Sequence, residues 1–216
     1  MRVLVATEKP FAANAVKAIK EEIEKAGHEL VLLEKYTELA QLLDAVKDVE
    51  AMIVRSDKIT PEIMDAAPKL KIIVRAGAGY DSIDTAYAKE KGIIVENTPG
   101  QNANAVAELV LGLLVYAVRA FYNGKSGSEL IGKKLGLLAF GNVGRNVARI
   151  AKGFGMDVYA YDAFCPANVI EEAGVHAVAS QEALFEQCNI VSLHIPATPE
   201  TKQSINYALV NRLPKG

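Results

Sequence analysis

Short continuous apolar runs alternate with helical patterns along the whole chain. In the first half the apolar runs are VLVAT from Val3, ELVLLE from Glu29, AMIVR from Ala51, LKIIVR from Leu70 and GIIVEN from Gly92. Helical patterns follow near residues 11–25, in TELAQLLDAV and in TPEIMDAA, where Thr60 can cap a helix and Pro61 suits its first turn. Apolar strands separated by helices are typical of a parallel sheet covered on both faces. The chain is therefore predicted to be an α/β protein.

The pattern divides the chain into two successive α/β units. The strands up to about Asn97 make one flavodoxin-like unit, and NTPG at 97–100 is a hinge candidate. A long helix is expected from Asn102 to Tyr122, and further strands are expected near 135–140, 157–161, 177 and 190–193. This second sheet has fewer strands than the roughly six of a full dinucleotide-binding fold. We predict a flavodoxin-like, parallel-sheet substrate domain over residues 1–98 and a Rossmann domain over residues 99–216 that is incomplete at its C-terminus.

Length and composition narrow the class of protein. The 216 residues suit two domains, and a 50% hydrophobic content supports a sizeable core. A net charge of −2 without a basic run argues against nucleic acid. The longest uncharged apolar run, residues 109–118, is too short to cross a bilayer, and no signal peptide precedes the first strand. Cys165 and Cys188 suit reduced thiols. We expect a soluble, cytoplasmic protein that binds no metal, nucleic acid or membrane.

The stretch LLAFGNVGRNVARIAKGFGMDVYAYD, which ends at Asp162, nearly matches a dinucleotide-binding fingerprint. Its A-x-G-x-x-G pattern places Gly141 where a diphosphate approaches the helix N-terminus and Gly144 where the helix packs on the strand. Asn142 and Val143 begin that helix, so these four residues are assigned to the cofactor. Ala139 replaces the first glycine. It costs little if its φ is negative and about 1–2 kcal/mol if its φ is positive.

The acidic residue Asp162 selects among dinucleotides. It ends the second strand about 20 residues after the glycines, where a carboxylate accepts the ribose hydroxyls. A 2′-phosphate would be repelled by that carboxylate, so NAD is favoured over NADP. The alternative is an ordinary α/β crossover whose glycines serve packing alone. The strand, glycines, helix, second strand and acid in register favour the NAD site.

Three further stretches carry a resemblance to a known family. They are VRAGAGYDSID from Val74, GIIVENTPGQNANAVAELVLGLL from Gly92 and VSLHIPATPETKQSIN from Val191. Together with GNVGRNVARIAKGFGM they resemble the D-isomer-specific 2-hydroxyacid dehydrogenases over essentially the whole chain, and most of all the phosphoglycerate dehydrogenases of serine biosynthesis. The resemblance implies an NAD-dependent oxidoreductase that converts 3-phosphoglycerate to 3-phosphohydroxypyruvate. It also implies a homodimer or higher homo-oligomer, and the apolar helix 102–122 suits such an interface.

The residues themselves suit an anionic substrate. Successive small residues at Gly77, Ala78 and Gly79 leave backbone N–H groups uncovered after a strand, and such a concavity suits a carboxylate. Arg55 and Arg75 end neighbouring strands, and two guanidiniums there suit a phosphorylated acid. The alternative is a pair of solvated surface arginines.

The resemblance adds further roles for single residues. It implies that the loop 77–79 holds the substrate carboxylate, with Ala78 also close to the nicotinamide. Asn102 would contact substrate, and Val106 would pack either on the nicotinamide or simply within its helix. Ile195 and Pro196 would line the adenosine side of the cofactor. His194, which precedes them, is not assigned as the catalytic base.

No catalytic residue is assigned within the chain. In the resembled family an Arg polarises the carbonyl, a His moves the proton and a Glu orients the His. The resemblance implies that all three lie beyond Gly216, as does a C-terminal helix that completes the first domain. We therefore expect the 216-residue chain alone to be inactive. Two alternatives stay open: an NAD-sensing regulatory module read by a partner, and a dehydrogenase for glycerate or lactate.

Overall fold

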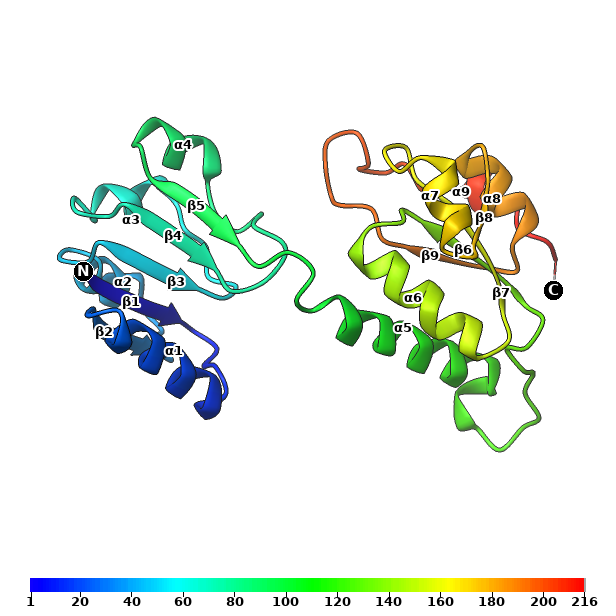
Figure 1. Cartoon of the computed structure of the whole chain (residues 1–216), viewed down its shortest axis with the longest axis horizontal. Helices are drawn as coiled ribbons and strands as arrows, with labels where there is room; N and C mark the ends of the chain where they lie inside the picture. The colour runs from blue at the N-terminus through cyan, green and yellow to red at the C-terminus, as the bar shows by residue number, and fades with distance from the viewer. Residues whose placement is uncertain (216) are drawn as a thin grey trace. The chain divides into compact units, whose positions relative to one another are not determined.

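The computed structural model describes residues 1–215 and divides into two compact units (Figure 1). The first unit is Met1–Gln101, and the second begins at Asn102. The division falls a few residues after the predicted boundary at 98. Each unit is built around its own parallel sheet, which confirms the predicted α/β class.

The first unit has a five-stranded sheet of order β2-β1-β3-β4-β5. Its strands are β1 (Arg2–Thr7), β2 (Glu29–Glu34), β3 (Ala51–Val54), β4 (Ile72–Arg75) and β5 (Ile94–Asn97). All neighbouring pairs are parallel, and the order is the flavodoxin-like one. The carboxyl ends of all five strands therefore meet at one edge, where the candidate substrate residues follow β3 and β4.

The helices of the first unit are α1 (Ala13–Lys25), α2 (Leu39–Ala45), α3 (Pro61–Asp65) and α4 (Thr85–Glu90). The helix α4 has no counterpart among the predicted elements. Its start is signalled by Asp84, whose carboxylate accepts a hydrogen bond from the Tyr87 amide at 2.9 Å. Thr60 is the N-cap residue of α3, which confirms the predicted position, but its hydroxyl makes no capping hydrogen bond. Pro61 does open the helix, because its fixed φ suits that position.

The two faces of the first sheet are covered unequally. Buried residues of α2, α3 and α4 form one core with Leu4, Met52 and Ile73. Right-handed crossovers place α1 on the opposite face, because β2 and β3 lie on opposite sides of β1. The helix α1 has no fully buried residue. On its face Leu32 and Ile94 are exposed although both belong to the sheet. The face that carries α1 is therefore only partly covered.

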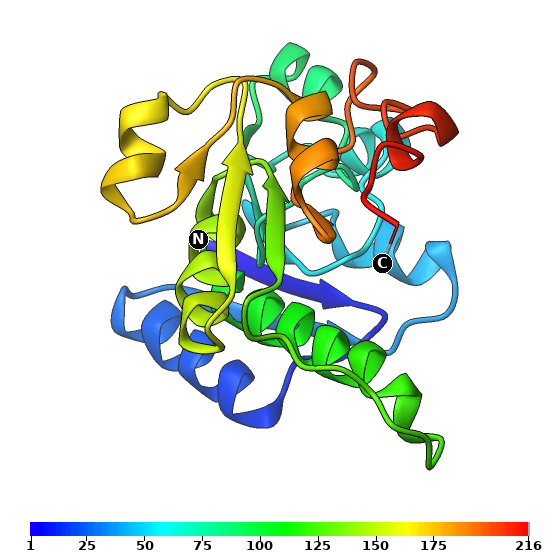
Figure 2. The same cartoon turned by 90° about the vertical axis from the view of Figure 1, so that its right-hand side faces the viewer.

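The second unit has a four-stranded sheet of order β8-β7-β6-β9. The strands are β6 (Lys134–Leu138), β7 (Asp157–Tyr161), β8 (His176–Ala177) and β9 (Ile190–Leu193), and the helices are α5 (Ala103–Val118), α6 (Asn142–Gly153), α7 (Ala167–Glu172), α8 (Gln181–Gln187) and α9 (Tyr207–Val210). The helices α5 and α6 pack together on one face, and α8 packs on the other around Leu138 and Cys188 (Figures 1 and 2). Among the strands of this unit, only the end of β6 differs notably from the prediction, which extended it to residue 140.

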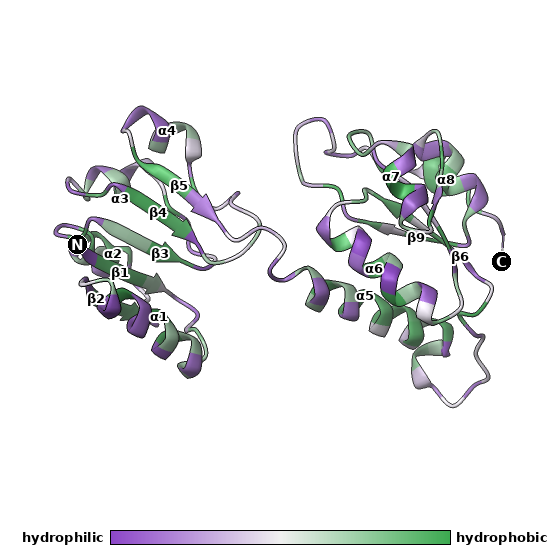
Figure 3. Ribbon diagram, viewed as in Figure 1, coloured by the Kyte–Doolittle hydropathy of each residue, from purple (hydrophilic) through white to green (hydrophobic). Residues whose placement is uncertain are grey.

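The predicted helix from 102 to 122 is regular only as far as Val118. The next turn, η1 (Ala120–Tyr122), has φ values of 50°, 56° and 55°, which is the left-handed region. Each such residue costs about 1–2 kcal/mol relative to right-handed backbone. The ring of Phe121 lies 5.3 Å from that of Tyr116, which helps to hold the turn. The apolar character of α5 is visible along most of its length in Figure 3.

Candidate functional site

The turn from β6 into α6 has the geometry of a phosphate-binding turn. Gly141 is the N-cap of α6, and nothing lies within 4 Å of the position that a Cβ would take there. The amides of Asn142 and Val143 open the helix next to this space. A Cβ on Gly144 would lie 2.4 Å from the carbonyl oxygen of Ala139, so the helix passes too close to the strand for any side chain. One glycine leaves room for a ligand and the other permits the packing.

Ala139 has a φ of 84°. The sequence left both signs open, and the structure selects the strained one. The backbone is held there by the Ala139 amide, which donates to the Tyr161 carbonyl at 2.8 Å. The strain of about 1–2 kcal/mol is small beside the stability of a domain. The turn is therefore retained without its first glycine.

Asp162 organises the backbone around the turn. One carboxylate oxygen accepts from the Phe140 amide at 2.7 Å, and the other accepts from the amides of Phe164 and Cys165 at 2.8 and 3.0 Å. Burial opposes ionisation, but the three amide hydrogen bonds and the nearby Arg145 hold the pKa of Asp162 below its usual value. The carboxylate is therefore ionised at neutral pH, and it can still accept a further hydrogen bond.

A cavity of about 590 Å³ lies beside this turn, within the second unit. Its lining brings together four of the predicted cofactor residues, namely Gly141, Asp162, Ile195 and Pro196. Its volume is in the usual range for small-molecule sites, roughly 300–1,000 Å³. The loop after β9 is braced by Thr201, whose hydroxyl donates to the Pro196 carbonyl at 2.6 Å. The carboxyl ends of β6, β7 and β9 thus form one crevice with an acid on one side and an apolar wall on the other.

His194 also lines this cavity, although no role was predicted for it from the sequence. Its Nε2 atom is buried and has no hydrogen-bond partner within residues 1–215. Burial lowers the pKa of His194, so the ring is neutral at pH 7. A neutral, unpartnered ring nitrogen in a crevice can serve a ligand as donor or acceptor.

The loop from Arg75 to Gly79 follows β4 at the carboxyl edge of the first sheet. The Gly77 amide donates back to the Arg75 carbonyl at 2.8 Å, so it does not contribute to an open concavity as predicted. The Ala78 and Gly79 amides have no acceptor among the described residues. The Ala78 carbonyl is fixed by the side-chain amide of Asn97 at 2.6 Å. Two amides rather than three are therefore free for an anion.

The two arginines end neighbouring strands. Val54 pairs with Arg75 in the β3–β4 register, and Arg55 follows Val54 directly. Arg75 lies across its own loop, because a Cβ on Gly77 would be 1.4 Å from the Arg75 Nη1 atom. Its Nε atom is buried without a partner within residues 1–215. Arg55 is exposed, and its Nη1 atom donates to the carbonyls of Lys9 and Pro10 at 3.4 and 3.2 Å.

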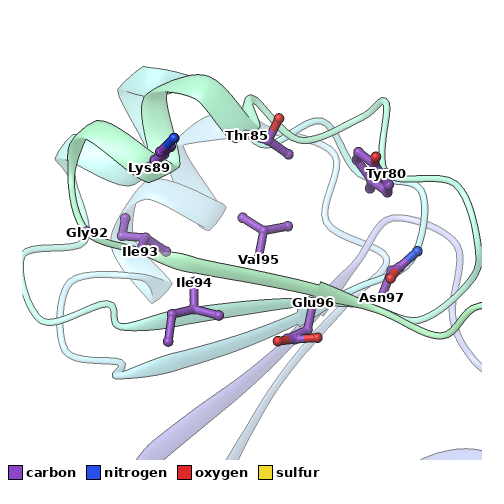
Figure 4. Close-up of a pocket in the computed structure, with 9 residues that line it drawn as sticks. All are labelled: Tyr80, Thr85, Lys89, Gly92, Ile93, Ile94, Val95, Glu96 and Asn97. Carbon is purple, nitrogen blue, oxygen red and sulfur yellow. The ribbon is translucent and has the colours of Figure 1, made fainter.

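A second cavity in the first unit, of about 580 Å³, lies between α4 and the edge strand β5 (Figure 4). Tyr80, Thr85, Lys89 and Asn97 line it together with residues 92–96. In Figure 4 Val95 points toward α4, whereas Ile94 and Glu96 point to the other side of the strand. Tyr80 and Asn97 connect this cavity to the loop 77–79, because Asn97 bonds the Ala78 carbonyl. Sequence reasoning did not predict the cavity, because α4 was not predicted.

The remaining predicted residues lie at the start of α5 and stay untested in their roles. Asn102 precedes the helix and is exposed, and its side chain makes no capping bond. Val106 is half-buried one turn later.

No proton-transfer pair is found in the part of the chain that the structure describes. The ring of His176 lies 4.8 Å from that of Tyr159, and His28 contacts the N-terminal amine at 3.3 Å. Within residues 1–215 no histidine is paired with a carboxylate. The same residues contain no cluster of metal-ligating side chains, and no helix among them is both long and apolar enough to cross a membrane.

The chain is similar in sequence to known proteins. Residues 3–211 match the family model described as D-isomer specific 2-hydroxyacid dehydrogenase, catalytic domain. The chain is 40% identical over 202 residues to hydroxypyruvate reductase of Thermotoga maritima, covering 87% of this chain and 65% of that protein. It is 38% identical to D-3-phosphoglycerate dehydrogenase of Methanocaldococcus jannaschii, covering 76% of this chain and 34% of that protein.

Solved structures show the same relationship. NAD⁺-bound 3-phosphoglycerate dehydrogenase of Entamoeba histolytica superposes with a TM-score of 0.91 at 48% identity, covering 99% of this chain and 68% of that one. The apo-structure of D-lactate dehydrogenase from Escherichia coli gives a TM-score of 0.80 at 26% identity, covering 99% and 71%. The chain thus spans about two thirds or less of the length of these relatives.

Proposed function

The chain belongs to the D-isomer specific 2-hydroxyacid dehydrogenase family, and on that premise we propose that the full-length protein oxidises 3-phosphoglycerate to 3-phosphohydroxypyruvate with NAD. We place this activity in serine biosynthesis, in the cytoplasm. The observation that carries the choice of substrate is the pair of arginines at neighbouring strand ends, Arg55 and Arg75. A three-carbon acid with a phosphate needs more positive charge than lactate or glycerate does.

The cavity beside α6 fits the dinucleotide. The open space at Gly141 leaves room for a diphosphate next to the amides of Asn142 and Val143, where the helix dipole favours negative charge. Asp162 would accept the adenosine ribose hydroxyls, and Ile195 and Pro196 would contact the adenine side. When bound, NAD supplies the acceptor for the hydride that leaves the hydroxyl-bearing carbon.

The substrate groups are assigned to the first unit. The free amides of Ala78 and Gly79 would bind the carboxylate, and Arg55 and Arg75 would bind the phosphate as charge-assisted partners. Asn102 would contact the substrate, and Ala78 with Val106 would contact the nicotinamide. We propose that the Arg, Glu and His of proton transfer are supplied outside residues 1–216.

The exposed half of the first sheet supports a longer parent protein. Parallel sheets are buried on both faces, yet Leu32 in β2 and Ile94 in β5 remain exposed on the face that carries α1. We propose that a further helix of the full-length protein covers this face and completes the first domain.

Replacement of Arg75 by Ala tests the substrate choice. In the full-length protein we expect KM for 3-phosphoglycerate to rise roughly 10- to 100-fold, since a charge-assisted hydrogen bond contributes about 1.5–3 kcal/mol. The KM for D-glycerate should change much less. Steady-state assays of NADH formation give both values. Equal losses for the two acids would instead indicate a role in carboxylate binding, and a wild type that prefers glycerate or lactate would refute the proposed substrate.

A non-catalytic NAD-sensing module is the competing function. A second alternative is an enzyme for an unphosphorylated three-carbon acid, which the similarity to hydroxypyruvate reductase of Thermotoga maritima supports. Thermal unfolding in the presence of NAD separates the three readings. Protection by 3-phosphoglycerate supports the proposed enzyme, protection by hydroxypyruvate alone supports the second enzyme, and protection by neither supports the sensor.

We further propose that the protein is a homodimer or higher homo-oligomer through α5. Leu109, Leu113 and Tyr116 lie on one stripe of the helix and are 62%, 57% and 45% exposed. We expect Leu113→Glu to yield monomers, because a charge in an apolar interface stays unpaired. Light scattering after size-exclusion chromatography measures the mass. The same change at Leu39, an exposed leucine of the first unit, should leave the oligomer intact, and an unchanged mass for the Leu113 variant would rule out this interface.

A further inference from the structure

Asp57 is a buried carboxylate that no predicted site includes. Its exposure is 4%, and it follows β3 by three residues, next to Arg55. No cationic side chain within residues 1–215 forms a salt bridge with it. A buried, unpaired charge is costly unless hydrogen bonds satisfy it. The hydrogen bonds that Asp57 accepts at this edge of the sheet must therefore compensate for its burial.

The carboxylate of Asp57 is satisfied by donors from three different loops. Its Oδ1 atom accepts from the Glu8 amide and from the Tyr36 hydroxyl, both at 2.8 Å. Its Oδ2 atom accepts from the amides of Arg55 and Ser56, both at 3.3 Å. These donors follow β1, β2 and β3, the three strands at one side of the sheet. One side chain thus ties together three loops at the carboxyl edge.

The Tyr36 hydroxyl stays protonated and therefore remains a hydrogen-bond donor to this carboxylate. Its side chain is only 7% exposed. Burial, followed by the hydrogen bond to Asp57, raises the pKa of the Tyr36 hydroxyl far above its usual value. The hydroxyl therefore keeps its proton throughout the physiological range.

The Asp57 carboxylate fixes both the backbone of Arg55 and the loop that contacts the Arg55 guanidinium. It binds the Arg55 amide directly, and it binds the Glu8 amide at the start of the loop that contacts the Arg55 guanidinium. That loop supplies the carbonyls of Lys9 and Pro10 to Nη1, and the ring of Phe11 lies 6.0 Å from the guanidinium carbon. Each of these three parts therefore contacts the other two: Asp57, Arg55 and the loop 8–11. The head of a long, exposed side chain is thereby confined, which lowers the entropy cost of binding an anion.

We propose that Asp57 is a positioning residue of the substrate anion site, which fixes Arg55 and the loop 8–11 for the phosphate of the substrate. This inference rests on the proposed function, because it assigns Arg55 to that phosphate. Asp57 itself does not touch substrate. Its buried charge is retained because only an acceptor with two oxygens can serve four donors from three loops.

The sharpest variant is Asp57→Asn. The remaining carbonyl oxygen can keep the two short bonds from Glu8 and Tyr36, whereas the new amide group faces the N–H groups of Arg55 and Ser56 as donor against donor. Arg55 is then released while the rest of the network is kept. Tyr36→Phe removes one donor only and is expected to fold even if the first variant does not.

The first unit offers a matched control in a second Tyr–Asp pair. Asp65 accepts from the Tyr87 hydroxyl at 2.7 Å and from Lys91 at 2.6 Å. It ends α3, and a crossover helix runs antiparallel to its strands, so this pair lies toward the opposite edge of the sheet. Asp65→Asn and Tyr87→Phe remove similar bonds from the same unit without touching the substrate edge.

The test is steady-state kinetics on the full-length protein with 3-phosphoglycerate and with D-glycerate. For Asp57→Asn we expect KM for 3-phosphoglycerate and the inhibition constant of inorganic phosphate to rise about tenfold or more, with kcat and the KM for NAD within a few-fold of wild type. Tyr36→Phe should shift the same two constants by a smaller factor in the same direction. The two control variants should leave them unchanged. A mere loss of stability would lower kcat through the folded fraction and would leave KM alone.

The outcomes separate the two proposals. If wild type binds phosphate and 3-phosphoglycerate but Asp57→Asn and Tyr36→Phe bind them equally well, the positioning role is overturned and the proposed function stands. The same holds if KM for glycerate rises as much as KM for 3-phosphoglycerate. If wild type itself binds no phosphorylated acid, the proposed function fails, and the positioning role is overturned with it.

Discussion

A protein made of residues 1–216 alone should bind NAD yet show no measurable oxidation of 2-hydroxy acids. The cavity proposed for the nucleotide is lined wholly by residues of the second unit, so NAD binding should need no residue beyond this chain. Turnover needs a group that removes the hydroxyl proton as the hydride leaves. The chain has three histidines. His28 contacts the N-terminal amine, His176 packs on Tyr159, and the Nε2 atom of His194 has no partner within residues 1–215. Within residues 1–215 none of them is oriented by a carboxylate, so the loss should be complete rather than partial.

Two measurements on purified protein of confirmed mass check this expectation. Calorimetric titration with NAD should give saturable binding, and absorbance of NADH should show no activity above the blank. The full-length protein, assayed beside it, should be active. Robust turnover by the 216-residue protein would mean that its own side chains, with His194 the first candidate, carry the proton transfer.

Replacement of Asp162 by Ala should cause the second large loss, in NAD affinity. The change removes the proposed acceptor for the ribose hydroxyls and frees three backbone amides, those of Phe140, Phe164 and Cys165. With about 1.5–3 kcal/mol for a hydrogen bond to a charged group, we expect the Kd for NAD to rise roughly 10- to 100-fold. Affinity for NADP should fall less, because the repulsion of its 2′-phosphate is also removed. Titration calorimetry with both cofactors gives the two constants.

The Asp162 carboxylate should also make the free energy of unfolding depend on pH, in a direction that follows from its lowered pKa. The pKa of Asp162 is lower in the folded protein than in the unfolded chain, where it is about 3.9. Its contribution to the free energy of unfolding is therefore present above that value and is lost as the pH falls toward the folded-state pKa. Acid unfolding followed by circular dichroism should show a smaller acid-dependent loss in Asp162→Ala than in wild type. Asp157, at the other end of β7, serves as the control position. Identical acid profiles for Asp162→Ala and wild type would contradict the role of the network.

Most of the strands could be predicted from the sequence because their signal is local. The runs at Val3, Glu29 and Ile190 are apolar for the length of a strand and are bounded by polar residues, so each strand can be recognised without its neighbours. The helix α4 was missed because its six residues, TAYAKE, carry too little apolar periodicity. Thr60 takes the predicted N-cap position without a side-chain bond, because residue type permits a capping bond but does not orient the hydroxyl.

The candidate site was predicted in outline for a different reason. Parallel strands bring their carboxyl ends to one edge of a sheet, so residues that follow strands lie at that edge whatever their separation in sequence. Arg55 and Arg75 do so in the first sheet, and Asp162 does so in the second. Asp57 was not predicted, although it follows a strand as well. Its partner Glu8 is 49 positions away and contributes a backbone amide, which leaves no signature in residue type.

The sequence by itself determined the class of fold, the two sheets and the edge of each sheet where polar and glycine residues collect, because strand and helix periodicity and the parallel connection are properties of local pattern. Only the tertiary structure decided the positive φ of Ala139, the occupied amide of Gly77, the half-covered face of the first sheet and the three loops held by Asp57. Those features depend on which backbone groups meet after the chain has folded, and a backbone amide is the same in every residue except proline.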